Sequence, residues 1–171
     1  MTWTAPEVQR TPGSLVAGER EMLTGYLAWF RSTLLHKCAG LTGEQLAEQS
    51  VAPSNLTLLG LIRHMAKVER TWFRERFAGL AFDSMYDPEK GKDADFEDLD
   101  PACAAEAYER LVEECRLADR IVADASLDDT FVHRGEEHSL RLIHLHMITE
   151  YARHIGHADL VRERVDGVTG G

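Results

Sequence analysis

The sequence predicts an all-α protein built as a four-helix bundle. Four long segments repeat apolar residues at three- and four-residue intervals, turn-forming residues separate these segments, and a chain of 171 residues suits one domain. A helix of about 25 residues is roughly 37 Å long, which suits side-by-side packing. We therefore expect a single bundle over residues 1–171, up-down in topology, with two connections long enough to carry a crossover.

The first helix is expected from about Leu15 to Cys38, after a polar opening (residues 1–13) that is expected to be flexible. Its apolar face repeats helically at Met22, Tyr26, Trp29, Phe30 and Leu34. A brief helical turn follows in LTGEQLAEQ, where Thr42 precedes Gln45 by three residues, the pattern of a capping box.

The second and third long helices have recognisable start signals. The second follows APSN, with Ser54 or Asn55 as its N-cap, and should end near Phe77. The third should begin at Asp100, which caps a helix whose first residue is proline, and should end near Ala125.

The connections on either side of the third helix differ in character. The stretch DSMYDPEKGKDADFEDLDP (Asp83–Pro101) is rich in acids, and residues 83–100 are expected to form a solvated acidic connector; capture of cations or of a basic partner is the alternative. After the third helix, Thr130–His133 is expected to be extended. Ser139 can then cap the fourth helix, which should end near Val165.

The composition excludes several classes of protein. Hydrophobic residues make up 44% and charged residues 28%, close to globular averages, so the chain is neither disordered nor a membrane protein. No apolar run approaches the roughly 18–20 residues that cross a bilayer, and the polar opening MTWTAPEVQRTPG lacks the basic and apolar regions typical of a signal peptide, so we expect a cytoplasmic protein. A net charge of −10 argues against nucleic acid as a partner.

The three cysteines, Cys38, Cys103 and Cys115, match neither a disulfide framework nor a C-x-x-C metal site. Cys103 and Cys115 lie nearly in phase with the apolar face of the third helix, so both are expected to pack in the core. We expect all three thiols to be reduced and structural.

Two polar residues interrupt the apolar stripe of the fourth helix. Glu150 and His154 lie among the apolar residues that face the bundle core, and their i, i+4 spacing places both side chains on one face. A carboxylate facing a core costs several kcal/mol unless it protonates, pairs with a cation or binds a metal. A shared metal ion explains both residues at once.

His64 interrupts the apolar stripe of the second helix in the same way, between Leu61 and Val68. A satisfied core histidine is the alternative reading. Together, His64, Glu150 and His154 would hold a divalent metal and leave at least one coordination position open, as catalytic sites do. Zn²⁺ is the first expectation, with Ni²⁺ or Fe²⁺ as alternatives.

The other histidines are not expected to be ligands of the predicted metal site. His144 lies off the stripe and should be exposed, whereas His146 and His157 border the predicted site without a clear role. His146 could instead form an i, i+4 pair with Glu150, and His157 could be a neighbour of the ligands. The remaining three are expected on the surface or in loops, namely His36, His133 and His138.

Two windows of the sequence resemble the DinB-like four-helix bundle superfamily, which includes mycothiol-dependent maleylpyruvate isomerases and bacterial thiol S-transferases. They are LIRHMAKVERTWF (Leu61–Phe73) and HMITEYARHIGHADLVRERVDG (His146–Gly167). The superfamily holds a divalent metal with one histidine of the second helix and two residues four apart on the fourth, which correspond to His64, Glu150 and His154. The further C-terminal domain of the isomerase is absent here, so isomerase activity itself is not expected.

The resemblance implies a metal-dependent transferase that activates a low-molecular-weight thiol of the mycothiol type for addition to a small electrophile. A bound cation stabilises a thiolate at neutral pH, which agrees with this chemistry. A polar cosubstrate could meet basic residues at the mouth of the site, for which the candidates are Arg63, Lys67, Arg153 and Arg162. A homodimer is expected. The alternatives are a non-catalytic metal-binding bundle for storage, sensing or stress, and a metal-assisted hydrolase.

Overall fold

The computed structural model describes residues 2–97 and 99–169 and is mostly helical. In chain order its elements are α1 (Glu19–Cys38), α2 (Gly43–Leu46), α3 (Leu58–Glu69), the π-helix η1 (Arg70–Phe77), the 3₁₀ helices η2 (Pro88–Phe96) and η3 (Pro101–Cys103), α4 (Ala104–Val122), the strands β1 (Thr130–His133) and β2 (Glu136–Ser139), and α5 (Leu140–Asp166). No helix in these described ranges is both long enough and apolar enough to cross a membrane.

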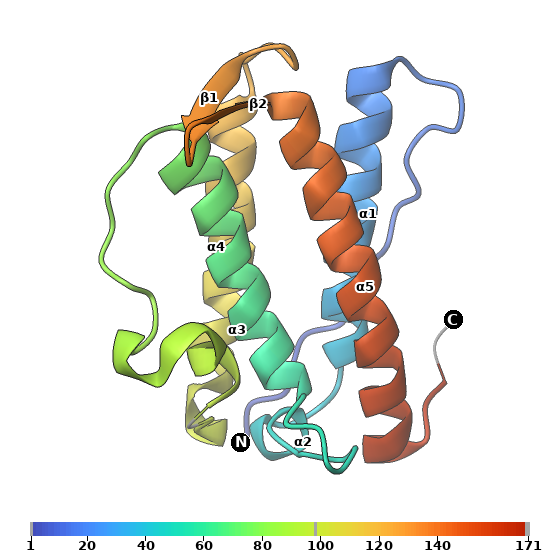
Figure 1. Ribbon diagram of the computed structural model, residues 1–171. Coiled ribbons are helices and arrows are strands. Elements are labelled where there is room, and N and C mark those ends of the chain that lie inside the picture. The colour runs from blue at the N-terminus through green and yellow to red at the C-terminus, as the bar shows by residue number, and fades with distance from the viewer. Residues whose placement is uncertain (1, 98, 170–171) are drawn as a thin grey trace.

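The long helices α1, α3, α4 and α5 lie side by side (Figure 1). α1 packs along α5, α4 packs along α3, and α3 also contacts α5. α3 and α4 run in the same direction, so the connection between them (residues 78–100) returns along the length of the molecule. The expected crossover is therefore found in this connection, and a strict up-down order is wrong for this pair.

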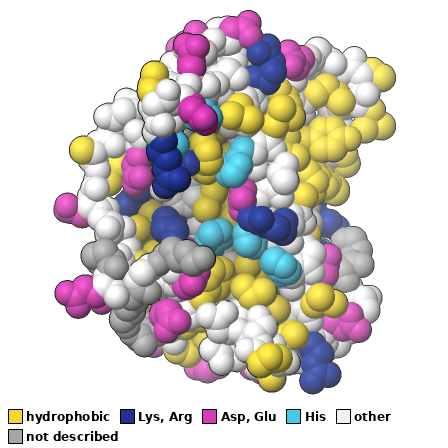
Figure 2. Space-filling view, viewed as in Figure 1, with side chains coloured by type: hydrophobic (Ala, Val, Ile, Leu, Met, Phe, Trp, Pro, Cys, Tyr) yellow, Lys and Arg dark blue, Asp and Glu magenta, His cyan; other side chains and the backbone are white. Residues whose placement is uncertain are grey.

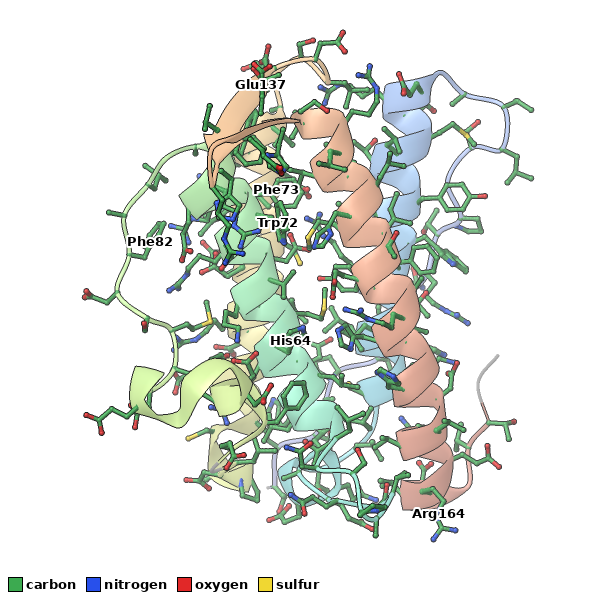
Figure 3. All side chains as sticks on the ribbon, in the orientation of Figure 1. His64, Trp72, Phe73, Phe82, Glu137 and Arg164 are labelled. Carbon is green, nitrogen blue, oxygen red and sulfur yellow. The ribbon has the colours of Figure 1, made fainter. Side chains whose placement is uncertain are left out.

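Histidine side chains gather along a groove on the face shown in Figure 2, between the segment formed by α3 and η1 and the helix α5. Lys and Arg side chains lie beside them along the same groove. His64, Trp72 and Phe73 lie one above another along α3 and η1, on the side that faces α5 (Figure 3). The groove thus has one wall from each half of the sequence.

Several predicted helix starts are confirmed by side-chain caps. Thr42 accepts a hydrogen bond from the backbone N–H of Gln45, and the Gln45 side chain accepts one from the backbone N–H of Thr42, completing the capping box. Asp100 and Ser139 cap η3 and α5. Two starts differ from the expectation: α1 begins at Glu19, and Thr57 caps α3 by accepting from the N–H of Gly60 at 2.9 Å.

A β-hairpin connects α4 to α5. β1 covers the residues predicted to be extended, but its antiparallel partner β2 was not predicted. The turn consists of Arg134 and Gly135, with φ values of 54° and 82°. Positive φ at both central residues is the pattern of a type I′ hairpin turn, and glycine adopts it freely whereas arginine does not. The hairpin packs on η1, where the Phe131 and Phe77 rings meet edge to face at 6.1 Å.

The acidic connector is only partly solvated. Its η2 segment packs against α3 and buries Ala94 and Asp95. The approach is so close that a Cβ added at Gly60 would lie 2.5 Å from the Phe96 ring. The expectation of a fully solvated connector is wrong for this segment, because Ala94 and Phe96 provide an apolar surface on both sides of Asp95.

The N-terminal segment also packs on the domain. Ala5 is buried and exchanges backbone hydrogen bonds with Gly40 and Leu41, at 2.8 and 2.9 Å. Thr4 forms an isolated antiparallel bridge with Thr42, and the Trp3 ring contacts Tyr108. Residues 3–5 therefore contribute to the core edge instead of forming the free tail expected for residues 1–13.

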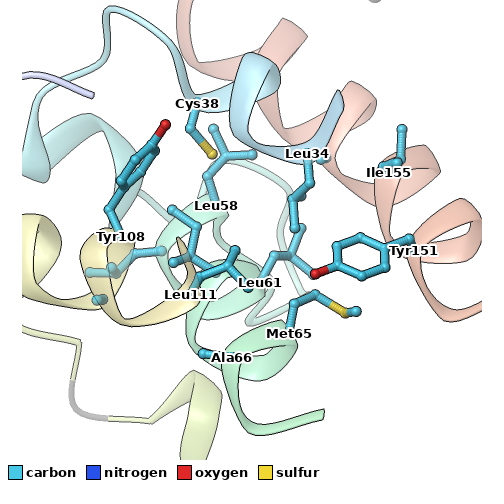
Figure 4. Close-up of a cluster of buried hydrophobic side chains, with 14 of the residues drawn as sticks. Leu34, Cys38, Leu58, Leu61, Met65, Ala66, Tyr108, Leu111, Tyr151 and Ile155 are labelled. Carbon is cyan, nitrogen blue, oxygen red and sulfur yellow. The ribbon is translucent and has the colours of Figure 1, made fainter. Parts of the chain in front are cut away.

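The core is an apolar cluster contributed by all the long helices (Figure 4), and a buried ion pair lies beside it. Glu69 is fully buried and accepts two hydrogen bonds of 2.6 Å from Arg31 and one of 2.9 Å from the Tyr151 hydroxyl. Arg31 also donates to Asp119 at the surface. A bidentate pair with its remaining lone pairs occupied offsets much of the desolvation cost of the two buried charges.

All three cysteines are free thiols, as predicted. Burial raises the pKa of Cys38 to about 12 and moves the pKa of Cys115 well above its usual value. Cys103 is exposed in η3, so the expectation that it packs in the core is wrong. Its position before the first turn of α4 removes it from the helical phase on which that expectation depended.

Candidate metal centre

Two helices bring the three predicted ligands together. α3 carries His64, and α5 carries Glu150 and His154 one turn apart. One potential ligand atom from each residue lies within 4.8 Å of the other two. Two ligands of one zinc ion can be separated by up to about 4.2 Å, twice the metal–nitrogen bond length, so small side-chain rotations are enough to close the cluster.

Asp95 orients His64. Its Oδ2 accepts a hydrogen bond from His64 Nδ1 at 2.8 Å, and its Oδ1 accepts one from Lys67 Nζ at 2.5 Å. Burial alone would raise the pKa of Asp95, but the hydrogen bonds from His64 and Lys67 outweigh it and hold the pKa below the usual value. An ionised Asp95 keeps the proton of His64 on Nδ1 and directs the Nε2 lone pair away from Asp95, as carboxylates beside metal-ligating histidines do.

The protonation states of the two residues on α5 suit a cation. Burial, aided by the charge of His64, lowers the pKa of His154 to about 4, so its imidazole is neutral at neutral pH. Burial would raise the pKa of Glu150, but the hydrogen bond and charge of Arg153 outweigh it and hold the pKa low. Both groups therefore offer lone pairs without first losing a proton.

The His154 ring has unsatisfied polar atoms. Both of its nitrogens are buried and have no hydrogen-bond partner in the described part of the chain. Its Nε2 lies 3.3 Å from Glu150 Oε2 without the alignment of a hydrogen bond. Orphaned buried nitrogens cost free energy, and a cation shared with Glu150 and His64 would satisfy one of them. The donor set and its environment thus fit a divalent metal.

Among the other histidines, the structure contradicts the prediction for His144. His144 is buried against α1, where its Nδ1 donates to the Leu140 carbonyl at 3.1 Å, so the prediction that it is exposed is wrong. His146 packs against Trp72 with ring centroids 4.2 Å apart and lies 3.7 Å from Glu150. His157 lies beside His154, with ring centroids 5.5 Å apart. The other three lie outside the cluster, namely His36, His133 and His138.

Of the four basic residues considered at the mouth of the site, two lie beside the ligands. Lys67 contacts Asp95, and Arg153 donates to Glu150 at 2.7 Å. Arg63 instead donates to the Ala94 and Glu97 carbonyls and holds the connector on α3. Arg162 donates to carbonyls at the end of α1, so neither Arg63 nor Arg162 faces the cluster.

In a comparison with protein-family models, the chain matches the family described as mycothiol-S-transferase over residues 22–167. The chain belongs to this family. The family is part of the DinB-like superfamily, so the resemblance stated from the two sequence windows is confirmed. Membership relates the chain to transferases that use the small thiol mycothiol. No curated protein and no solved structure matches the chain.

In this mycothiol-S-transferase family member, two features around His64, Glu150 and His154 were not predicted from the sequence. The first is Asp95, whose only sequence signal is the apolar pair Ala94 and Phe96 on either side of it. The second is the aromatic wall formed by Trp72 and His146, which continues the groove beyond the cluster. Trp72 is displayed by η1, and no residue pattern in the sequence marked the change from α-helix to π-helix.

Proposed function

We propose that the chain is a metal-dependent transferase that holds one divalent ion, with Zn²⁺ as the first candidate, at His64, Glu150 and His154. The observation that carries the proposal is the convergence of these three groups within 4.8 Å, with Asp95 orienting His64. We take the four long helices to form a four-helix bundle of the DinB-like kind, in which the groove between α3 and α5 admits the substrates. A homodimer remains a prediction from the resemblance.

A divalent cation in this position would supply the positive charge that lowers the pKa of a thiol toward neutrality. The residues of the chain do the rest. His64, Glu150 and His154 contribute one negative charge in total, so the site keeps a net positive charge toward an incoming thiol. Asp95 and Lys67 fix the His64 ring, and Arg153 fixes the Glu150 carboxylate. Preorganised groups of this kind lose little energy to reorientation during the reaction.

The cosubstrate is expected to be a mycothiol-type thiol and the acceptor a small electrophile. In the reaction the S–H bond breaks and the thiol sulfur forms a bond to an electrophilic carbon, while a π bond of that carbon, or its bond to a leaving group, breaks. In the first case the displaced electron pair takes up a proton on the product, and in the second it departs with the leaving group while the thiol proton goes to solvent. The site lies in a groove and not in a closed cavity, with His64 and Glu150 both partly accessible, so both reactants can approach from the same face (Figure 2).

The decisive experiment combines metal analysis with turnover. Purified with metal supplied, the full chain should contain about one divalent ion, His64→Ala should lose the ion, and His138→Ala, a histidine outside the cluster, should keep it. Consumption of mycothiol in the presence of a panel of electrophiles should require the ion. A chain that stays metal-free, or whose ion is indifferent to His64→Ala, contradicts the proposal. One ion without thiol consumption would instead favour a non-catalytic metal-binding protein.

A further inference from the structure

Two arginines at the hairpin end of the groove lack carboxylate partners. Arg76, in η1, and Arg134, in the hairpin turn, form no ion pair in the described part of the chain. Burial, aided by the charge of Arg134, lowers the pKa of Arg76, and Glu75 is the acid that opposes this effect. In a chain with a net charge of −10, two guanidinium groups without a carboxylate partner at the same end of the molecule are unexpected.

The Arg76 guanidinium is held in position by an aromatic ring. It lies over Trp72, with its central carbon 4.0 Å from the ring centroid. When a guanidinium stacks on an indole, its N–H groups point outward from the stack and stay free. These N–H groups are the part of the guanidinium that binds a carboxylate through two parallel hydrogen bonds. The stacking therefore orients Arg76 without using its hydrogen-bonding capacity.

Arg134 occupies its position at a conformational cost. Its φ of 54° lies in the left-handed region, where turns of this type favour Asn, Asp or Gly. A non-glycine residue there costs of order 1 kcal/mol, and such outliers cluster at functional sites. The hairpin packs on η1 through Phe131 and Phe77, so the strained turn is held beside the helix that carries Arg76.

The arginine pair is connected to the candidate metal centre by a continuous wall. Trp72 packs on His146 at 4.2 Å, and His146 Nε2 lies 3.7 Å from Glu150 Oε1. Trp72 follows His64 by eight residues, so the guanidinium over its ring is up to about 12 Å from His64 along the helix. A planar molecule of that length could contact both ends of the groove.

We propose that Arg76 and Arg134 form a subsite for a carboxylate on the electrophile, whose planar body lies against Trp72 and His146. This inference rests on the proposed function, because it assigns the electrophile to the class of acids with an aromatic or conjugated body. The carboxylate binds at the hairpin end, and the electrophilic carbon then lies near the three converging residues. The subsite itself needs no metal, so it can be tested separately.

The first test measures binding to the metal-free full chain by isothermal titration calorimetry, with naphthalene-2-carboxylate and naphthalene-2-carboxamide as probes. The acid should bind about tenfold or more tightly than the amide, because a charge-assisted bidentate contact is stronger than a neutral one. Arg76→Gln and Arg134→Gly should each bring the ratio close to one. Arg134→Gly also removes the left-handed arginine and should fold at least as stably, so its effect cannot be attributed to unfolding.

Arg164→Gln is the matched control, because it removes the same charge at the far end of α5 (Figure 3). It should keep the preference for the acid. Equal binding of acid and amide by the unaltered chain overturns the subsite, as does a ratio that neither arginine variant changes. An equal loss of preference in Arg164→Gln also overturns it, because net charge alone would then explain the binding.

The second test uses the metal-supplied chain, mycothiol, and 6-(bromomethyl)naphthalene-2-carboxylate or its methyl ester. In this reaction the sulfur–carbon bond forms, the carbon–bromine bond breaks, and bromide and the thiol proton are released. The acid should be favoured in kcat/KM by about tenfold, and Arg76→Gln should remove that advantage. Turnover with no preference overturns the role of the subsite in the reaction. Acid-selective binding without any turnover supports the subsite and counts against the proposed function.

Discussion

Asp95 contributes to the candidate metal centre only through His64. Replacing it with Asn keeps the size of the side chain but removes the charge that holds the proton on His64 Nδ1. Metal affinity should fall by about 10- to 100-fold, the usual effect of removing such a partner. Competition with a chelator of known affinity measures the change. Asp93 is an exposed carboxylate in the same segment, and Asp93→Asn should leave the metal affinity unchanged. Equal losses of affinity in both variants would mean that the net charge of the segment, and not the contact of Asp95 with His64, sets the affinity.

Replacing Glu69 should strongly destabilise the fold. Glu69→Gln leaves the buried Arg31 guanidinium without its bidentate partner, and breaking a buried pair costs roughly 3–5 kcal/mol. The free energy of unfolding in urea measures the effect. Glu113→Gln, which breaks an exposed pair with Arg116, should change that free energy little. A similar effect of the two substitutions would contradict the importance assigned to the buried pair.

His144 should make stability depend on pH. Burial lowers the pKa of His144 below the ordinary value of about 6.5, so below that pH the unfolded chain binds a proton that the native chain excludes. Stability is therefore lost as the pH falls below about 6.5, with a slope of at most about 1.4 kcal/mol per pH unit for one proton. Denaturation of the unaltered chain and of His144→Asn at pH 7.5 and 5.5 should show a smaller loss in the variant. Equal losses would contradict this role.

The three converging residues could be predicted from the sequence because helical phase alone places Glu150 and His154 on one face of α5 and His64 on a facing helix. Asp95 could not, since its position depends on how a connector without helical periodicity folds back on α3. His144 was misjudged for a related reason. α5 packs on α1 as well as on α3, so it buries a broader face than a single stripe.

The contact between η2 and α3 positions Asp95, and Gly60 makes that contact possible. A Cβ at Gly60 would lie 2.5 Å from the Phe96 ring, which itself stacks on His64. Gly60→Ala should therefore destabilise the fold by about 1–3 kcal/mol and weaken metal binding, although alanine is the better helix former. Urea denaturation and metal titration measure the two effects.

Gly156→Ala is the matched control for this element. Gly156 lies within α5 with nothing within 4 Å of an added Cβ, so the substitution should stabilise the fold by up to about 1 kcal/mol. If Gly60→Ala stabilised the chain as Gly156→Ala does, the close packing of η2 on α3 would be disproved.

Elements with strong local signals were predicted well, and those defined by tertiary contacts were not. The caps at Thr42, Asp100 and Ser139 depend on side chains next to the helices that they begin. β2 has the sequence EEHS, in which apolar and polar residues do not alternate, and it forms because the turn returns the chain onto β1. The predicted N-cap of α3, Ser54 or Asn55, lies before the observed N-cap, Thr57, because serine and asparagine are at least as good N-caps as threonine.

At the scale of the whole molecule, metal binding should appear as thermal stability. A ligand that binds only the native state at 100 times its dissociation constant adds about 2.7 kcal/mol, or roughly 5–10 °C in Tm for a domain of this size. Adding Zn²⁺ to the chelated chain should raise Tm by this amount. His64→Ala should show no such rise, and an equal rise in that variant would place the ion elsewhere.

The exposure of the three cysteine thiols has a consequence for this member of the mycothiol-S-transferase family. Cys38 is buried and Cys115 is half-buried, and burial raises the pKa of both thiols so that they stay protonated, whereas Cys103 is exposed in η3. Disulfide exchange needs an accessible thiolate, so a small disulfide, such as the oxidised form of a low-molecular-weight thiol, would attach to the folded chain at Cys103. Oxidative stress would therefore add at most one small thiol per molecule, at the opposite end of the connector from η1, and would leave the core intact.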